Sequence, residues 1–289
     1  MNSVKAEKPK KLIAFGWYGG KYSHLDWLLP LLPKTKHFCE PFGGSGAVLF
    51  NREPSDVETY NDIDGEVVNF FRVLRERRNE LIEMIGLTPF SKKEFEYAIN
   101  GLGDKSLTDI ERARLFYIRA RQVRTGLAQK ASIGRWANCT LTSRAGMAGA
   151  VSRWLGSIDD LPHIAGRLLR VQIECAPALE VIKRYDSSET LFYCDPPYPH
   201  DSRSDTNAYG YEMMDDEHRE LASGLHAAKG KVAISGYESK LMSELYKKWK
   251  KIKGPIRNIN SVRKPRQEIL WTNYDPMLID KNETLWKNQ

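Results

Sequence analysis

The stretch that decides the fold is Thr190-Leu191-Phe192-Tyr193-Cys194-Asp195-Pro196-Pro197-Tyr198. Its first five residues form an apolar run bounded by a turn, which predicts a short buried strand. Neither proline has an N–H group to donate, so the hydrogen-bonded ladder must end there. A carboxylate, a proline carbonyl and an aromatic ring are therefore expected at the carboxyl end of a strand. That edge is where open α/β sheets bind their ligands.

These three groups suit one kind of ligand. The Asp195 carboxylate and the Pro196 carbonyl can both accept hydrogen bonds from a single NH2 group. The Tyr198 ring can stack on the flat heterocycle that carries this group. The structural alternative is a strand that ends in a Pro-Pro turn, with Asp195 serving only as its cap.

Two glycine-containing turns precede this stretch. The first is Gly16-Trp17-Tyr18-Gly19-Gly20-Lys21, where adjacent glycines permit positive φ and a close approach of a ligand to the backbone. It is not a phosphate-binding P-loop, because Phe15 holds the place of the first glycine and Tyr22 replaces Ser or Thr. The second turn, Glu40-Pro41-Phe42-Gly43-Gly44-Ser45-Gly46, lies between a predicted strand and a predicted helix. This order opens a nucleotide-binding α/β unit, although the dinucleotide fingerprint G-x-G-x-x-G is absent.

An acidic residue follows the next predicted strand, residues 57–60. That strand ends in Asn61-Asp62-Ile63-Asp64, about 20 residues after the second glycine turn, where a carboxylate typically accepts the hydroxyl hydrogens of a ribose. The alternative role for Asp62 is to cap the helix predicted over residues 66–77.

Strand and helix patterns alternate outside a central segment. Strands are predicted over 35–39, 57–60, 169–174, 190–194, 231–235 and 268–273, and helices over 23–32, 66–77, 176–185, 216–229 and 241–249. From about residue 75 to 161 the pattern changes to short helical stretches broken by glycines. We therefore predict an α/β domain with an inserted, mainly helical subdomain.

The inserted segment is strongly basic within a chain whose net charge is +7. Between Arg112 and Asp159 there is no acidic residue, and the nine basic ones are Arg112, Arg114, Arg119, Arg121, Arg124, Lys130, Arg135, Arg144 and Arg153. A solvated helix face normally mixes charges of both signs, so this run favours contact with nucleic acid over a bland basic surface.

Cysteine usage and hydropathy bear on the cellular compartment and on metal or membrane binding. The cysteines are Cys39, Cys139, Cys175 and Cys194. They form no C-x-x-C pair and have no histidine at zinc-ligand spacing, so we predict buried thiols, a reducing compartment and no metal site. No apolar run is long enough for a membrane span or a secretory signal, so a cytoplasmic location is expected.

Together, these motifs resemble those of the D12-class, Dam-like DNA adenine N6-methyltransferases. In that group a glycine motif, a recognition insert and D-P-P-Y follow one another in the order found here. The resemblance implies a Rossmann-like methyltransferase fold, with a seven-stranded, mostly parallel sheet that has one antiparallel strand. It implies S-adenosylmethionine as cofactor and double-stranded DNA as substrate. It divides the chain into a catalytic domain, residues 1–75 and 165–289, and an inserted target-recognition subdomain, residues 76–164.

The resemblance also implies roles for particular residues. The cofactor pocket would be formed by Trp17, Gly19, Gly20, Lys21, Glu40, Phe42, Gly43, Gly44, Ser45, Asp62 and Asp195. Within it, Lys21 would lie near the methionine carboxylate and Asp62 would hold the ribose. The catalytic residues would be Asp195, Pro196, Pro197 and Tyr198. DNA would be contacted by Arg119, Arg121, Arg124, Lys130 and Arg135.

The implied chemistry addresses the low reactivity of an aromatic amino group. The lone pair of adenine N6 is delocalised into the ring, so two acceptors on its hydrogens would localise that pair. They would also stabilise the positive charge that develops during attack on the methyl group. Because the nitrogen is inaccessible inside a duplex, the base must be flipped out.

The alternative activities differ from this assignment in their motifs. A cytosine-C5 methyltransferase needs a Pro-Cys nucleophile, which the chain lacks. An enzyme acting on cytosine N4 usually carries Ser-Pro-Pro, and RNA or protein-glutamine enzymes usually carry Asn-Pro-Pro-Tyr. A DNA-binding protein with a degenerate site is the non-enzymatic alternative.

The recognition sequence stays open. The insert lacks the R-Y-N and F-N-V-P sequences of enzymes specific for GATC. The resemblance is to bacterial and phage proteins, and it leaves open whether a restriction endonuclease counterpart exists in the same system. A monomer or weak dimer is expected.

Overall fold

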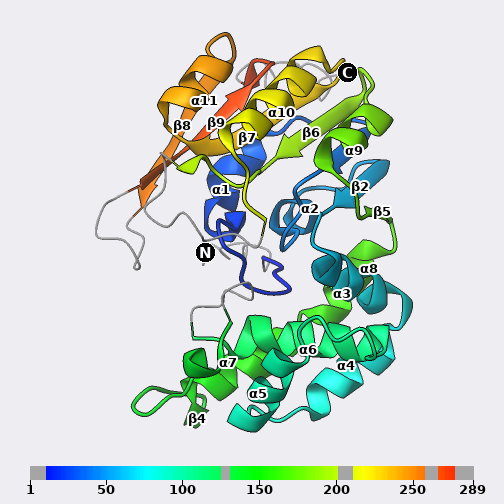
Figure 1. The fold of residues 1–289 in the computed structure, drawn as a ribbon, viewed down its shortest axis with the longest axis vertical. Coiled ribbons are helices and arrows are strands. Elements are labelled where there is room, and N and C mark those ends of the chain that lie inside the picture. Colours follow the sequence, from blue (N-terminus) through cyan, green and yellow to red (C-terminus); the bar gives the residue numbers. More distant parts are fainter. Residues whose placement is uncertain (1–10, 125–130, 201–210, 258–265, 277–289) are drawn as a thin grey trace, which may run out of the picture.

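A seven-stranded sheet organises the larger part of the molecule (Figure 1). The structure is a computed structural model that describes residues 11–124, 131–200, 211–257 and 266–276. In these residues the strand order is β5-β2-β1-β6-β7-β9-β8. The strands are β1 His37–Glu40, β2 Val57–Asn61, β5 Val171–Glu174, β6 Thr190–Cys194, β7 Lys231–Tyr237, β8 Lys250–Arg257 and β9 Arg266–Thr272.

Strand direction agrees with the predicted fold. Neighbouring strands from β5 through β7 pair in parallel, whereas β9 runs antiparallel to both β7 and β8. The prediction of a mostly parallel sheet with one antiparallel strand is therefore confirmed.

Helices cover both faces of the sheet because the central strands are apolar on both sides. On β6, Leu191 and Tyr193 join one buried cluster, while Phe192 and Cys194 join the other. The first cluster is covered by α1 Leu25–Leu28, α2 Ala47–Asn51 and α3 Gly65–Glu76. The second is covered by α9 Ala178–Tyr185, α10 Asp215–Ala227 and α11 Lys240–Leu245. Short 3-10 turns, η1 Lys21–His24 and η2 Leu29–Leu31, flank α1.

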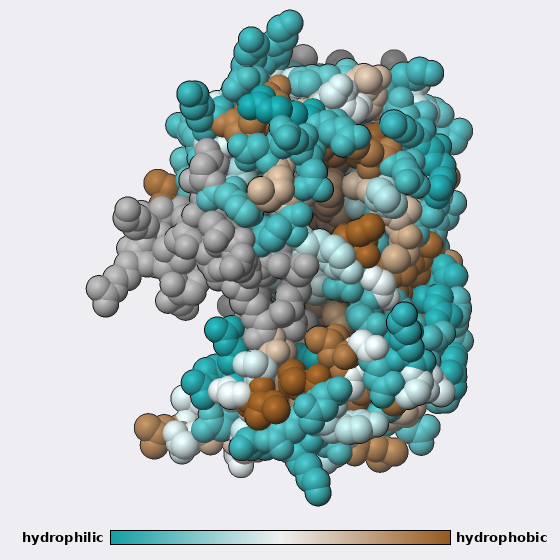
Figure 2. Space-filling model, in the orientation of Figure 1, coloured by the Kyte–Doolittle hydropathy of each residue, from teal (hydrophilic) through white to brown (hydrophobic). Residues whose placement is uncertain are grey.

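The inserted segment is mainly helical, as predicted. It contains α4 Arg78–Leu87, α5 Lys92–Asn100, α6 Asp109–Gln122, η4 Ile133–Arg135, a hairpin of β3 Ser143–Arg144 and β4 Met147–Ala148, α7 Gly149–Ile158, and the start of α8 Leu161–Leu168. It lies below the sheet in Figure 1. The expected boundary at residue 75/76 falls at the end of α3, whereas the one at 164/165 falls inside α8. Figure 2 shows that the surface is hollowed between the two parts and that hydrophobic residues gather there.

Two local predictions were wrong. Residues 23–32 do not form one helix but η1, α1 and η2, and Pro30 lies at the start of η2. Strand β8 was missed, and the helix expected to reach residue 249 ends at Leu245. Strand β8 carries Lys250, Lys251 and Lys253, which hide the apolar pattern of a strand. Since β8 is an edge strand, such lysines protect it from pairing with other chains.

Aromatic side chains join the sheet part to the insert. On α3, the Phe70 ring lies 5.5 Å from Phe15, 5.6 Å from Phe116 and 5.5 Å from Tyr117, against which it stacks. Tyr117 in turn contacts Trp154 of α7. The hydrophobic core is therefore continuous between the two parts, and neither can lose its packing independently.

We expect Phe70→Ala to destabilise the whole chain by about 3–5 kcal/mol, because it removes a buried ring shared by both parts. Urea denaturation followed by tryptophan fluorescence and by circular dichroism should give one coincident transition at a lower midpoint. Leu87→Ala is the control, because Leu87 is 79% exposed and its truncation should change stability by no more than about 0.5 kcal/mol. Two separate transitions would contradict the shared core.

Candidate active site

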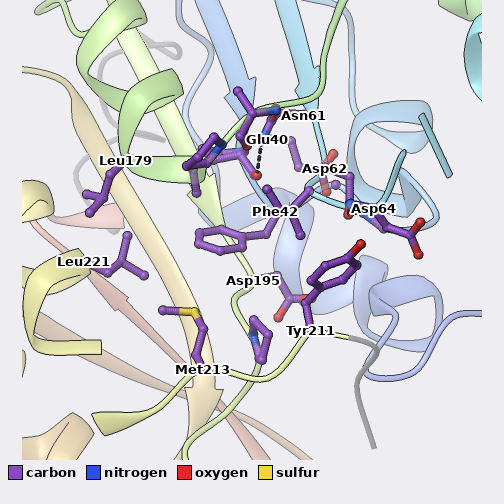
Figure 3. A pocket seen from close by; sticks show the side chains of 18 of the residues that line it. Glu40, Phe42, Asn61, Asp62, Asp64, Leu179, Asp195, Tyr211, Met213 and Leu221 are labelled. Carbon is purple, nitrogen blue, oxygen red and sulfur yellow. Dashed lines mark hydrogen bonds between the residues drawn. The ribbon is translucent and has the colours of Figure 1, made fainter. Parts of the chain in front are cut away.

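A cavity of about 580 Å³ lies at the carboxyl ends of β1, β2 and β6 (Figure 3). This is the edge at which the sequence placed the ligand site. The predicted site residues that line it are Trp17, Gly20, Lys21, Glu40, Phe42, Gly43, Gly44, Ser45, Asp62, Asp195 and Pro197. The predicted residues outside this lining are Gly19, Pro196 and Tyr198.

The second glycine turn is packed too tightly for side chains. A Cβ atom on Gly43 would lie 2.1 Å from the Tyr60 ring. Gly44 has a φ of 49°, and a Cβ there would lie 2.6 Å from the Trp17 ring. Glycine is thus required at both positions, which brings the backbone of the turn directly against the cavity.

Asn61 ties together three loops around the cavity. Its Nδ2 donates to the Pro41 carbonyl at 2.8 Å and to the Ala176 carbonyl at 3.0 Å. Its Oδ1 accepts from the Ala176 backbone N–H at 2.9 Å. Because the loops after β1, β2 and β5 are joined through one buried side chain, the pocket is already shaped before any ligand binds.

Asp62 is held by backbone groups and not by a cation. Its carboxylate accepts hydrogen bonds from Gly44 N–H and Asp64 N–H, at 2.7 and 2.8 Å. Burial raises the pKa of Asp62 to about 6, against the opposing effect of these hydrogen bonds. The alternative role of helix cap is filled by Asp64, which accepts from Glu66 N–H at the start of α3. Asp62 is therefore left to face the cavity.

The cavity has an acidic side and an apolar side. In Figure 3, Phe42 lies between Asp62 and Asp64 on one side and Leu179, Leu221 and Met213 on the other. A flat, partly polar ligand such as a nucleoside suits this division.

Several lining residues were missed by sequence reasoning. Leu179, Tyr211, Met213 and Leu221 come from segments with no distinctive motif. The loop predicted next to the site was residues 201–211. Of these, residues 201–210 lie outside the described residues, and Tyr211 lines the cavity. The only available signal for Tyr211 was its place at the end of that predicted loop.

Lys21 and Asp195 form a buried ion pair at the base of the cavity. The Lys21 side chain is only 3% exposed, and its Nζ lies 2.7 Å from the Asp195 carboxylate. The same Nζ donates to the Gly19 carbonyl at 2.7 Å and lies 3.3 Å from Glu268. A lysine has three N–H donors, and the hydrogen bonds to Gly19 and Asp195 use two of them. That Lys21 lies near the methionine carboxylate stays a prediction, and Lys21 does line the cavity.

Burial and neighbouring charges act on this pair in opposite directions. Burial by itself lowers the pKa of Lys21, but the carboxylates of Asp195 and Glu268 outweigh it and raise that pKa. Burial raises the pKa of Asp195, helped by Glu268 and opposed by Lys21. Lys21 is thus the main charge that favours an ionised Asp195 in a buried position.

Tyr198 is more enclosed than expected. It is only 2% exposed, its ring meets Tyr237 edge-on at 4.8 Å, and its hydroxyl contacts both Asp195 and Glu268. Stacking of this ring on a base stays a prediction, because in this structure the ring does not line the cavity.

The basic residues of the insert divide into two groups. Arg119 was wrongly placed on the DNA surface, since it is 3% exposed and donates to the Ala98 carbonyl at 2.8 Å. Arg121 is half-buried and donates to the carbonyls of Ile13 and Ala14. Arg112 and Arg114 pair with carboxylates, namely those of Glu66, Glu94, Asp109 and Glu111.

The second group of basic residues is exposed. It comprises Arg124, Arg135, Arg144 and Arg153. Arg144 lies in the β3–β4 hairpin, whose turn has positive φ at Ala145 and Gly146. Lys130 lies outside the described residues.

The cysteine prediction was correct for two residues. Cys39 and Cys194 are buried, whereas Cys139 is partly exposed and Cys175 is exposed.

In the part of the chain that the structure describes, no cluster of His, Cys, Asp or Glu could hold a metal ion. No helix among the described residues is long and apolar enough to cross a membrane.

A mostly parallel sheet that carries a glycine turn, Asp62 and the D-P-P-Y residues at its carboxyl edge, next to one cavity, is typical of nucleotide-binding α/β folds. The family model described as "D12 class N6 adenine-specific DNA methyltransferase" matches residues 17–260, so the chain belongs to that family. This match confirms the predicted family and the Rossmann-like methyltransferase fold.

Individual relatives resemble this chain at modest sequence identity. The DNA N-6-adenine-methyltransferase of Escherichia phage P1 is 25% identical over 240 residues, covering 80% of this chain but only 30% of the phage protein. The DNA adenine methylase of Escherichia coli K12 is 26% identical over 268 residues, covering 88% of this chain and 92% of that protein. The Type II methyltransferase M1.LlaDCHI of Lactococcus lactis is 26% identical over 285 residues, covering 89% and 94%.

Proposed function

We propose that this protein transfers a methyl group from S-adenosylmethionine to the N6 amino group of adenine in duplex DNA, after the base has been flipped out. The observation that carries this proposal is the position of Asp195 directly after β6, where its carboxylate meets the cavity that Asp62 also lines. The N6 adenine specificity in the description of the family supports the same substrate.

The cavity residues fit the proposed methyl donor. A volume of about 580 Å³ is in the usual range for cofactor sites. Asp62 would accept hydrogen bonds from the ribose hydroxyls, and Phe42 and Leu179 would contact the adenine ring. Asp195 and Glu40 are acidic groups that suit a cationic ligand. When bound, the donor supplies a methyl group activated by a positively charged sulfur.

Asp195 would prepare the amino group of the target base. Its carboxylate accepts a hydrogen bond from N6–H, and the carbonyl of Pro196 would accept the second. Both acceptors favour a localised lone pair and stabilise the positive charge that develops on nitrogen. The buried Lys21 favours the ionised form of Asp195, which is the form that accepts, against the effect of burial, which raises the pKa of Asp195. After transfer, the nitrogen must release one proton, and the ionised Asp195 would be a base able to receive it.

The exposed arginines of the insert would hold the DNA backbone. Arg124 and Arg135 are adjacent, because Arg124 N–H donates to the Arg135 carbonyl at 2.7 Å. Arg144 is presented by a tight hairpin, and Arg153 by α7. None of these four has a carboxylate partner among the described ion pairs, in contrast to Arg112 and Arg114. Unneutralised charges on one segment favour a polyanion as partner.

We expect the affinity for S-adenosylhomocysteine to weaken as the pH falls through about 6. The ionised Asp62 accepts both ribose hydroxyl hydrogens, and the pKa of Asp62 is about 6, so protonation below that pH removes the better acceptor. Calorimetry between pH 5.5 and 8 measures this directly.

Asp62→Asn is the control for that titration. Its affinity should be lower and nearly independent of pH in this range. A pH dependence that persists unchanged in Asp62→Asn would assign the titration to another group, such as the buried Glu40, whose pKa is also raised by burial.

We expect Asp195→Ala to reduce turnover by about 10²–10³-fold or more, because one of two preorganised acceptors is removed. Asp195→Asn keeps one carbonyl acceptor and should retain more activity. DNA affinity should change little in either variant, since the exposed arginines lie in the insert. The assay is tritiated methyl transfer to mixed-sequence DNA followed by nucleoside chromatography. Label in methylcytosine, or full activity in Asp195→Ala, would contradict the assignment.

We expect Arg124→Gln, Arg135→Gln and Arg144→Gln each to weaken DNA binding. Each should also make the slope of the logarithm of the binding constant against the logarithm of the salt concentration shallower, by about one for each phosphate that is no longer neutralised. If an arginine reads a base edge, its replacement should instead reduce discrimination at one position by about 1–3 kcal/mol. Binding is measured by fluorescence anisotropy over a range of salt concentrations. The matched control is Arg184→Gln on α9, which removes the same charge from an exposed site on the sheet domain. Unchanged DNA affinity in a variant that carries all three replacements would exclude this surface as the DNA-binding site.

A further inference from the structure

Glu268 is a buried carboxylate beside the D-P-P-Y residues that no sequence motif indicated. It lies on β9, the antiparallel strand, where it is paired in register with Tyr237 of β7. Its side chain is 3% exposed, so its charge is costly unless hydrogen-bonded or paired. It does not belong to the described lining of the cavity.

The contacts of Glu268 are with the two neighbours of Asp195. The Tyr198 hydroxyl donates to Glu268 Oε1, and Lys21 Nζ lies 3.3 Å from the same oxygen. Both groups also contact Asp195, at 3.1 Å from the Tyr198 hydroxyl and 2.7 Å from Lys21 Nζ. Glu268 and Asp195 therefore share the same two donors.

This sharing determines how much hydrogen-bonding capacity Asp195 retains. A tyrosine hydroxyl has one proton, so it can donate fully to only one carboxylate at a time. An ionised carboxylate has about four acceptor positions on its two oxygens. Both Asp195 oxygens lie 2.7 Å from Lys21 Nζ. When Glu268 accepts the Tyr198 hydrogen bond and shares the charge of Lys21, Asp195 keeps acceptor positions for a ligand in the cavity. Without Glu268, both donors would turn to Asp195 alone.

We propose that Glu268 is a positioning residue for methyl transfer: by holding the Tyr198 hydroxyl and Lys21, it keeps an acceptor oxygen of Asp195 available to the amino group of the target base. This inference rests on the proposed function, in which Asp195 accepts a hydrogen bond from N6–H. Glu268 does not line the cavity, so it would act through Tyr198 and Lys21.

The test compares turnover with ligand affinity in Glu268→Gln. The amide keeps the shape of the side chain but removes the charge that competes for Lys21. We expect kcat to fall by roughly 10- to 100-fold, because a small displacement of a catalytic group has effects of that size. The dissociation constants for S-adenosylhomocysteine and for DNA should stay within about twofold, since Glu268 is outside the cavity. Glu238→Gln is the matched control, as it removes an exposed carboxylate that follows β7 and pairs with Lys251.

A double-mutant cycle with Tyr198→Phe separates positioning from simple support of the fold. If Glu268 acts through the Tyr198 hydroxyl, Glu268→Gln should cost clearly less in the Tyr198→Phe background than in the wild type. Effects of the two substitutions that simply multiply, or a kcat for Glu268→Gln within about twofold of wild type, would overturn the inference.

If Glu268→Gln does not fold, as judged by circular dichroism, Glu268→Asp decides, because it keeps the charge but draws the carboxylate away from the Tyr198 hydroxyl and Lys21. A lower kcat with unchanged affinities supports the inference, and an unchanged kcat overturns it. The proposed function is tested separately by Asp195→Ala. If Asp195→Ala loses adenine methylation and Glu268→Gln keeps full activity, the proposed function is supported and only the role of Glu268 is rejected.

Discussion

Lys21 lies buried between the carboxylates of Asp195 and Glu268, and the reactive end of the site depends on this arrangement. One buried cation between two anions is tolerable only because each group also has hydrogen-bonding partners, the Gly19 carbonyl for Lys21 and the Tyr198 hydroxyl for both carboxylates. The result is a carboxylate whose ionised form is favoured by a buried cation, next to a cavity that is partly apolar. A carboxylate of this kind is what activation of a weakly nucleophilic amino group requires.

The insert illustrates why a run of charge in a sequence does not define a binding surface. Its basic run predicted DNA contact, yet Arg119 is internal and Arg112 and Arg114 pair with carboxylates, some of them from other segments. Helix α6 carries these arginines and packs on α3 and α5, so its charges are used to join helices. The exposed charges lie in the later part of the insert, at residues such as Arg135 and Arg144.

Much of the fold could be predicted from local patterns. The strand 190–194 was predicted with its observed bounds, because an apolar run followed by two prolines has few other solutions. The glycine turn and Asp62 were predicted to share a site, and Gly44 N–H does donate to the Asp62 carboxylate. Strand β8 could not be predicted, because its lysines suit an edge position that exists only once the sheet has formed.

The sequence by itself determined the family, the order of the motifs along the chain and the acidic residue that follows each ligand-binding strand. These features depend only on residue types and their spacing over short stretches of sequence. Only the tertiary structure decided the partners of those groups. Glu268 reaches Tyr198 and Lys21 because β9 runs antiparallel beside β7, and Arg119 is internal because α6 packs in the core. Such contacts join residues tens to hundreds of positions apart, and their geometry depends on sheet register and helix packing, which local periodicity does not encode.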